Sequence, residues 1–257
     1  MAGPPQRIVS LVPSLTELLC WLGAGDRLVG RTQFCVEPPG LAARVPAFGG
    51  TKTPRVREIV ALAPDLVIAN KEENRREDVE ALQAAGLPVL LTDPTTVRGA
   101  VATVREIGAV TGCAGRADAL ATDIERELAR RPATGPRVFV AVWRKPLMGL
   151  GSDSYGHDLL EAAGAANVLA GRPRYPEVTL DELGDLRPDL ILLPNEPYRF
   201  EERHVAEFAP LAPARVVDGK VLWWYGPRIP AALRALRDLF NGSVGRPGDP
   251  GRPSPPR

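Results

Sequence analysis

Histidine, cysteine and aromatic residues are scarce in this chain. Its 257 residues include two histidines and three cysteines, and only 5% are aromatic. Because His157 and His204 are the only imidazoles, a zinc or manganese site built from several histidines is not expected. Cys20, Cys35 and Cys113 are odd in number and have no Cys-x-x-Cys spacing, so they indicate neither a disulfide framework nor a zinc site. We therefore expect no intrinsic metal or cofactor.

An excess of charge and a long hydrophobic run are also missing. The 32 lysines and arginines nearly balance the 31 aspartates and glutamates, which leaves a formal charge of +1 and no basic surplus for phosphates or anionic lipids. No apolar stretch has the length of a membrane span or a signal peptide. We expect no nucleic-acid partner, no membrane span, and a cytoplasmic location for the chain as written. A missing leader would instead place it outside the cytoplasm, in the periplasm.

Strands and helices alternate along the chain. The apolar run at 64–70 is typical of a strand buried on both faces, and it lies between helices predicted over 54–62 and 75–85. Ser14 and Glu17 have the spacing of a capping box, which predicts a helix that begins at Ser14. Further strands are predicted at 8–12, 27–30, 87–92, 137–143 and 188–195. This alternation favours an α/β fold with parallel sheets.

Two segments of the chain repeat each other. Pro-Asp-Leu opens a buried strand at 64–66 and again at 188–190, each time after a short helix that contains Glu58 or Glu182. Between them, apolar residues at helical spacing over 115–131 predict a helix about 25 Å long. We predict two similar lobes at 6–112 and 136–240, a connecting helix at 113–133, and a disordered Gly/Pro-rich tail at 241–257.

The ordered set of segments resembles a known family. Ile8-Val9-Ser10-Leu11-Val12-Pro13-Ser14-Leu15-Thr16-Glu17, Gly49-Gly50, the strand at 64–70, His157-Asp158-Leu159-Leu160 with Gly164 and Asn167, and the strand at 188–193 carry the resemblance. Together they resemble the iron-complex and vitamin B12 (cobalamin) solute-binding proteins of ABC importers, the helical-backbone metal receptor type. The match runs from about Arg7 to Phe240.

The resemblance implies a fold and a function. The fold is a pair of parallel-sheet α/β lobes joined by one long rigid helix, as in class III periplasmic binding proteins. The function is capture of a cobalamin, haem or ferric siderophore type of molecule between the lobes, by a monomer that serves an ABC permease and is not an enzyme.

Candidate ligand-binding residues follow from the topology, because ligands of open α/β sheets bind beyond the carboxyl ends of the strands. In the first lobe this rule selects Ser14, Arg31, Thr51, Lys52, Lys71, Glu72, Glu73 and Asn74. In the second lobe it selects Trp143, Tyr155, His157, Tyr198, Trp224, Tyr225 and Arg228. Aromatic rings pack against planar macrocycles, and an arginine can hold a carboxylate with two hydrogen bonds.

Several of these residues have a structural alternative. One of Trp223 and Trp224 could pack in the core and the other against the lobe interface, Glu72 or Glu73 could begin the next helix, and His157 could order the turn before its helix. The resemblance favours a ligand role for Trp224, since B12 binders of the family have a Trp shortly before a Pro-Arg-Ile.

The chain also departs from the pattern of the B12 binders. They have aromatic residues in place of Asn70 and near Leu91, and a docking glutamate near Arg76, where the nearest acid is Glu77. Two alternatives stay open: a cytosolic ligand-handling protein on the same fold, which the missing leader suggests, and an enzyme with Cys35 as nucleophile and His157 as base.

Overall fold

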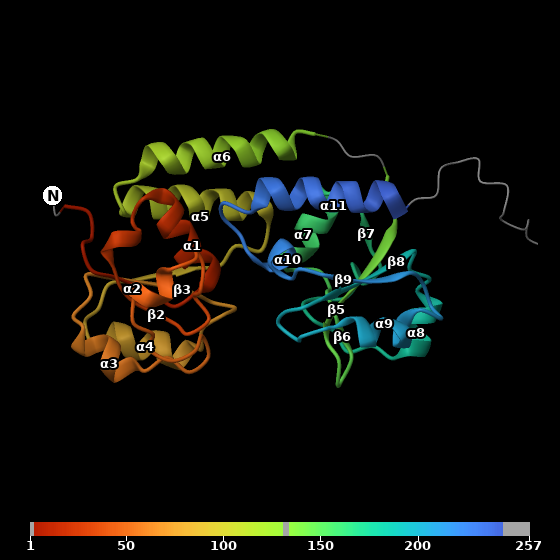
Figure 1. Cartoon of the computed structure of the whole chain (residues 1–257), viewed down its shortest axis with the longest axis horizontal. Helices are drawn as coiled ribbons and strands as arrows, with labels where there is room; N and C mark the ends of the chain where they lie inside the picture. The colour runs from red at the N-terminus through yellow and green to blue at the C-terminus, as the bar shows by residue number, and fades with distance from the viewer. Residues whose placement is uncertain (1–2, 131–133, 244–257) are drawn as a thin grey trace, which may run out of the picture. The chain divides into compact units, whose positions relative to one another are not determined.

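The computed structural model describes residues 3–130 and 134–243, which form two compact α/β units (Figure 1). The first unit takes the chain up to Ala129 together with Trp223–Pro230, and the second takes Arg130–Leu222 and the chain from Ala231 onward. Each unit has its own sheet, so the prediction of two α/β lobes is confirmed. The sequence placed 223–228 in the second lobe, and this assignment is corrected, because the segment packs with the first unit.

The sheet of the first unit is parallel throughout. Its strands lie in the order β2-β1-β3-β4, with bounds β1 Ile8–Ser10, β2 Leu28–Arg31, β3 Leu66–Asn70 and β4 Val89–Thr92. The helical elements are α1 Pro13–Leu22, η1 Gly25–Arg27, α2 Leu41–Arg44, α3 Val56–Ala61, α4 Arg76–Ala84, α5 Val97–Val110 and α6 Ala114–Leu128. Every residue of β3 is buried, as its continuous apolar sequence predicted.

The helix α1 begins one residue earlier than the sequence predicted. Val12 is its N-cap residue and Pro13 occupies the first helical position, where the missing N–H of proline costs no hydrogen bond. Ser14 is therefore inside the first turn, and it makes no capping hydrogen bond. The predicted capping box of Ser14 and Glu17 is wrong, because Glu17 pairs with an arginine elsewhere in the unit.

Two long helices, α5 and α6, pack along each other in the first unit (Figure 1). Their contact requires a glycine, since a Cβ atom at Gly108 would lie 2.2 Å from the Cβ of Ala117. The helix predicted over 115–131 is α6, the last helix before the chain passes to the second unit. The structure does not describe residues 131–133.

The sheet of the second unit is mainly parallel. β5 (Arg137–Trp143) pairs in parallel with β7 (Ala166–Asn167) and β8 (Leu190–Pro194) and antiparallel with β6 (Met148–Gly149), while β9 (Ala214–Val217) pairs in parallel with β8. The helical elements are α7 Tyr155–Ala162, α8 Leu180–Asp185, η2 Glu202–His204, α9 Val205–Phe208, α10 Lys220–Trp223 and α11 Ile229–Ser243. The core includes Phe139, Leu183, Ile191, Leu193 and Phe208.

The helix α11 overlaps the predicted tail. It runs to Ser243, so the first three residues assigned to a disordered tail at 241–257 are helical. The remainder of that prediction falls outside the described residues. Among the residues that are described, the helices lack either the length or the apolar character needed to cross a membrane.

The repeated Pro-Asp-Leu segments form the same local structure in both units. The Asp65 carboxylate accepts the backbone N–H of Arg7 at 2.8 Å, and the Asp189 carboxylate accepts that of Arg137 at 2.9 Å. Each arginine also donates from Nη2 to the carbonyl of the residue that follows a short helix. Arg7 donates to Leu62 after α3 at 2.7 Å, and Arg137 donates to Leu186 after the helix at 180–185 at 2.8 Å. The residue two positions before each aspartate has φ 46°. The two units are thus repeats in structure as well as in sequence.

Candidate functional site

The carboxyl ends of β1, β2, β3 and β4 meet at one edge of the first sheet, which we call the first edge. It comprises residues 11–14, 32–37, 49–52, 70–74 and 92–93. Most of the sequence-predicted residues of the first lobe lie on it. Some of their side chains are accessible to a ligand, and others are held by contacts within the fold.

The loop after β3 is held by two asparagines. The Asn70 side-chain oxygen accepts the backbone N–H groups of Glu72 and Glu73 at 2.9 and 3.2 Å. Asn74 accepts the N–H of Asn70 at 2.9 Å and donates to the Thr51 carbonyl at 2.9 Å. Asn74 is buried, and these bonds give it a role in shaping the loop that presents Glu72 and Glu73.

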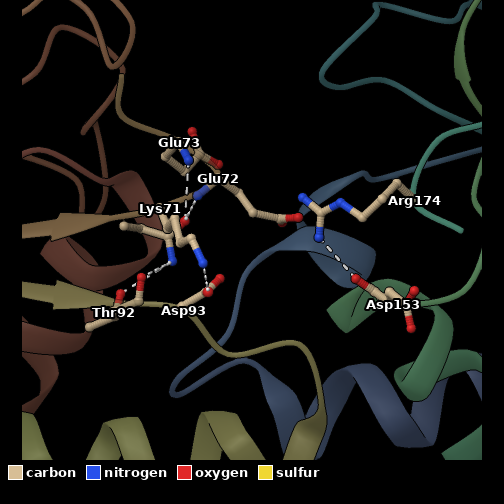
Figure 2. A network of polar contacts seen from close by, with 8 residues as sticks. Lys71, Glu72, Glu73, Thr92, Asp93, Asp153 and Arg174 are labelled. Carbon is tan, nitrogen blue, oxygen red and sulfur yellow. Dashed lines mark hydrogen bonds and ion pairs between the residues drawn. The ribbon is translucent and has the colours of Figure 1, made fainter. Parts of the chain in front are cut away.

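Lys71 is the most accessible polar residue of this loop. Its backbone N–H donates to the Thr92 carbonyl at 3.0 Å, and its Nζ atom lies 2.8 Å from a carboxylate oxygen of Asp93 (Figure 2). The lysine is exposed, and an exposed ion pair of this kind contributes about 1 kcal/mol or less. A ligand can therefore replace Asp93 as the partner of Lys71 at little cost.

Glu73 and Tyr225 form a less accessible polar group at the first edge. Burial raises the pKa of the Glu73 carboxyl, while the charge of Lys52 lowers it and that of Glu72 raises it. Burial also raises the pKa of Tyr225, and the charge of Glu73 adds to that effect. The Lys52 amine donates to the carbonyl of Glu72. Both the carboxyl and the phenol thus favour their protonated forms more than they would in water.

The segment 223–230 is anchored to the first unit by Arg228. Its Nε and Nη2 atoms donate to the two carboxylate oxygens of Glu17, each at 2.7 Å. The guanidinium group lies over the Trp224 ring, 5.2 Å from its centroid, and Trp224 and Tyr225 are buried. These contacts support the alternative in which Trp224 packs inside the protein. Arg228 pairs with Glu17, a carboxylate of the protein itself.

Arg31 and Ser14 are also committed to the fold. Arg31 is buried and donates to the carbonyls of Val45, Thr32 and Ala42 at 2.8, 2.9 and 3.2 Å. Ser14 is buried in the first turn of α1. Both lie at strand ends, as the topology predicted, but Ser14 is buried, and the Arg31 guanidinium is engaged with backbone carbonyls of its own unit.

Phe34 is a residue of the first edge that sequence reasoning missed. Phe34 is 52% exposed and Val36 is 49% exposed, while Cys35 between them is buried. The Cys35 thiol lies 3.1 Å from the Thr32 hydroxyl, which fixes the loop with Phe34 outward. Its position in the loop that follows β2, beyond the carboxyl end of a parallel strand, is the signal that would have identified it.

The second edge comprises residues 143–144, 195–198 and 218, which lie at the carboxyl ends of β5, β8 and β9. Trp143 is 42% exposed there, and its ring packs edge-on against Tyr198 with centroids 5.4 Å apart. The Tyr198 ring in turn packs against the Phe200 ring, with centroids 4.7 Å apart. Next to them, Arg144 donates to the Glu207 carboxylate at 2.9 Å. Trp143 is therefore an accessible ring held in place by packed neighbours.

His157 and Tyr155 lie in the first turn of α7. His157 contacts the Asn167 amide through Nδ1 at 3.1 Å and lies 3.6 Å from the Glu161 carboxylate through Nε2. These contacts support the alternative in which His157 orders its turn. Tyr155 is buried. In the neighbouring loop, Arg174 donates to the Asp153 carbonyl at 2.9 Å (Figure 2).

Two α/β units whose sheet edges present accessible aromatic and polar side chains define a binding protein of the bilobal class. The chain belongs to the periplasmic binding protein family, whose model matches residues 8–195. The vitamin B12-binding protein of Pectobacterium carotovorum is 26% identical over 201 residues, which are 75% of this chain and 72% of that one.

Two solved structures have the same fold. A periplasmic heme-binding protein from Pseudomonas aeruginosa is 26% identical, with a TM-score of 0.80 over 93% of this chain and 94% of its own. The periplasmic vitamin B12-binding protein BtuF of Vibrio cholerae is 20% identical, with a TM-score of 0.77 over 95% of this chain and 99% of its own. The resemblance predicted from the sequence is confirmed.

The comparisons correct one expectation. The cytoplasmic location predicted from the sequence is wrong, because the family and the two solved structures are of periplasmic binding proteins. The family and these relatives are binding proteins and not enzymes.

Proposed function

We propose that this protein is the substrate-binding component of an ABC importer and that it captures a metal-chelate or corrinoid-like molecule of the cobalamin, haem or ferric siderophore class. One observation carries the proposal: each sheet presents an accessible aromatic ring, Phe34 or Trp143, at the edge where ligands of this architecture bind. Vitamin B12 and heme, the ligands for which the relatives are named, contain flat macrocycles with polar peripheries. Aromatic faces and polar loops are suited to both features.

The proposed contacts are the accessible or partly accessible residues of the two edges. They are Phe34, Thr51, Lys52, Lys71, Glu72, Glu73, Trp143 and Tyr198. Ser14, Arg31, Asn74, Tyr155, His157, Trp224, Tyr225 and Arg228 act as the structure that positions them. This division replaces the broader set that the sequence predicted.

Capture is proposed to be reversible and without a chemical step. The alternative nucleophile, Cys35, is buried, and this burial raises the pKa of its thiol, although hydrogen bonds with Thr16 and Thr32 act in the opposite direction. A nucleophilic cysteine needs a lowered pKa and access to substrate. The remaining proposals are a monomeric state, no intrinsic cofactor, and an ABC permease as the partner.

Trp143 permits a controlled test of the proposal. Trp143 is 42% exposed at the second edge, and Trp21 is 44% exposed in the last turn of α1. Since α1 starts at the first edge and runs away from it for about 15 Å, Trp21 serves as a matched control of equal exposure.

The experiment is a titration of cyanocobalamin, dicyanocobinamide, hemin and ferrichrome, followed by calorimetry and tryptophan fluorescence. We expect saturable binding of at least one compound. Trp143→Ala should weaken it by about 1–2 kcal/mol, roughly 5- to 30-fold in Kd, while Trp21→Ala leaves Kd unchanged. If Trp143→Ala and Trp21→Ala changed Kd equally, Trp143 would not be part of the ligand-binding site. No binding of any compound would refute the proposed ligand class.

A further inference from the structure

We infer that a hollow between α5 and α6 of the first unit is a second binding site, which takes a carboxylate joined to a short apolar chain. The hollow shares no residue with either edge, so it uses none of the groups proposed to contact the captured ligand. The inference therefore goes beyond the proposed function, and neither depends on the other. It comes from the shape of this surface and from the charges around it.

The hollow has a volume of about 320 Å³. It is lined by Arg98, Val101, Ala102 and Arg105 of α5 and by Glu125 of α6. The four residues of α5 have the spacing i, i+3, i+4 and i+7, so their side chains follow one face of that helix. Small-molecule sites in proteins have volumes from about 300 Å³ upward, and this hollow is at the lower end of that range.

The centre of the hollow is apolar and its two ends are charged. Val101 is buried and Ala102 is exposed, and both lie between the two arginines in the sequence of α5. At one end, Nη1 and Nη2 of Arg105 donate to the two carboxylate oxygens of Glu125 at 2.8 and 3.3 Å. The other end is formed by Arg98, which is about 10.5 Å from Arg105 along the helix axis.

Arg98 acts on the same carboxylate as Arg105 but keeps its own donors. The hydrogen bonds from Arg105 lower the pKa of the Glu125 carboxyl, partial desolvation raises it, and the charges of Arg105 and Arg98 lower it further. Arg98 thus lies near Glu125, whose two oxygens are already bound by Arg105. A guanidinium carries five N–H donors, so Arg98 can bind a carboxylate that enters the hollow.

The position of Arg98 works against the stability of α5. It is the second residue of the helix, where the helix dipole is positive and a cation is unfavourable. The first turns of α4 and α8 each contain two acidic residues, whereas that of α5 contains none. Because the helix gains nothing from a cation at this place, we attribute Arg98 to the hollow that it lines.

The class of ligand follows from the two ends and the centre. A carboxylate can accept two hydrogen bonds from the Arg98 guanidinium, and an apolar chain can cover Val101 and Ala102. Glu125 repels a second anionic group from the far end, so one negative charge suffices. A free organic acid and an acidic side chain of another protein both provide this chemistry.

The test is a titration of isotope-labelled protein with hexanoate, followed by two-dimensional NMR of the backbone amides. Hexanol has the chain without the charge, and inorganic phosphate has the charge without the chain. The capped tripeptide acetyl-Leu-Glu-Leu-amide presents a carboxylate as part of a protein segment. Two variants, Arg98→Gln and Glu125→Gln, change the hollow. Two matched controls, Arg126→Gln and Asp123→Asn, change an exposed ion pair of α6 that does not line the hollow.

We expect saturable binding of hexanoate with a Kd of roughly 1–10 mM, because its ion pair stays open to solvent. The shifts should include residues 98–105 and 125. Arg98→Gln should weaken binding about 5-fold or more, and Glu125→Gln should strengthen it about 2- to 5-fold, since it releases the donors of Arg105. Hexanol and phosphate should bind at least about 5-fold more weakly than hexanoate, and each control should stay within about 1.5-fold of wild type.

Phosphate that binds as tightly as hexanoate would overturn the inference, because the hollow would then attract any anion. So would equal effects of Arg98→Gln and Arg126→Gln, shifts that exclude residues 98–105, or no saturable binding of hexanoate and the tripeptide. Tighter binding of the tripeptide would support an acidic protein segment as the source of the carboxylate, and tighter binding of hexanoate would support a free organic acid. A melting temperature of Arg98→Gln at or above that of wild type would show that its loss of binding is not unfolding. None of these results bears on the proposed function, which the Trp143 titration tests separately.

Discussion

A partly buried ion pair ties a late segment of the chain to the first helix of the first unit. Arg228 makes two hydrogen bonds of 2.7 Å to Glu17, and the two side chains are 32% and 16% exposed. Its Nη2 atom also lies 3.7 Å from a carboxylate oxygen of Glu37, and the guanidinium covers Trp224. The pair therefore fixes 223–230 against the first unit, and its loss should be visible in the stability of the protein.

The size of the effect follows from the burial of the two partners. Breaking a buried ion pair by removing one partner costs about 3–5 kcal/mol, whereas an exposed pair contributes about 1 kcal/mol or less. Arg228 keeps about a third of its surface in solvent, but the carboxylate of Glu17 does not. We expect Arg228→Gln to lower the free energy of unfolding by about 2–3 kcal/mol, because it also leaves Glu17 next to Glu37 without the intervening cation.

A double-mutant cycle separates the pair from other effects of the substitution. Glu17→Gln and Arg228→Gln are measured singly and together by urea unfolding, followed by far-UV circular dichroism. We expect the double variant to be about 1–2 kcal/mol more stable than the sum of the single losses predicts. A loss below about 0.5 kcal/mol for Arg228→Gln, or strictly additive losses, would refute the view that this pair anchors the segment.

Three further predictions concern packing, capping and protonation. Gly108→Ala should cost about 1–3 kcal/mol because its Cβ would meet Ala117 at 2.2 Å, whereas Gly115→Ala, which has open space, should not destabilise; equal melting temperatures would contradict this. Thr179→Ala should cost about 1 kcal/mol, since it removes the capping box of α8, and an unchanged urea midpoint would refute that role. Glu73→Gln should stabilise the protein at pH 7, because burial raises the pKa of Glu73 in the folded state and the ionised carboxylate therefore destabilises the fold. The increase in the free energy of unfolding should vanish below the usual pKa of 4.5, where the carboxyl is protonated in both states. An increase that does not depend on pH would argue against burial of the charge as its cause.

The helices and strands that sequence reasoning found are those with a clear apolar period. The helix predicted over 75–85 is α4, Arg76–Ala84, and its end is marked by Gly86, which has φ 84°. The helix α5 was missed because its sequence contains four valines and two glycines, which have low helix propensity. It is stabilised by packing against α6, a tertiary effect that a local sequence pattern does not contain.

The candidate site was predictable where it follows a buried strand and obscure elsewhere. Lys71, Glu72 and Glu73 come directly after β3, so the rule that ligands bind at carboxyl ends of strands located them. Phe34 was missed because its exposure depends on how the buried Cys35 turns the loop. Trp224 was assigned to the wrong unit, since sequence order does not reveal that the chain returns to the first unit before α11.

The two units share a structure at the amino ends of their strands and have different residues at the carboxyl ends. At the amino ends of the strands, Arg7 with Asp65 and Arg137 with Asp189 form the same hydrogen bonds, so this edge of the repeat has kept its structure. At the carboxyl ends, β3 leads into a loop of charged residues and β5 ends in an accessible tryptophan. A pair of identical edges would present the same groups twice. The edge of the first unit instead presents charged groups beside Phe34, and the edge of the second unit presents Trp143.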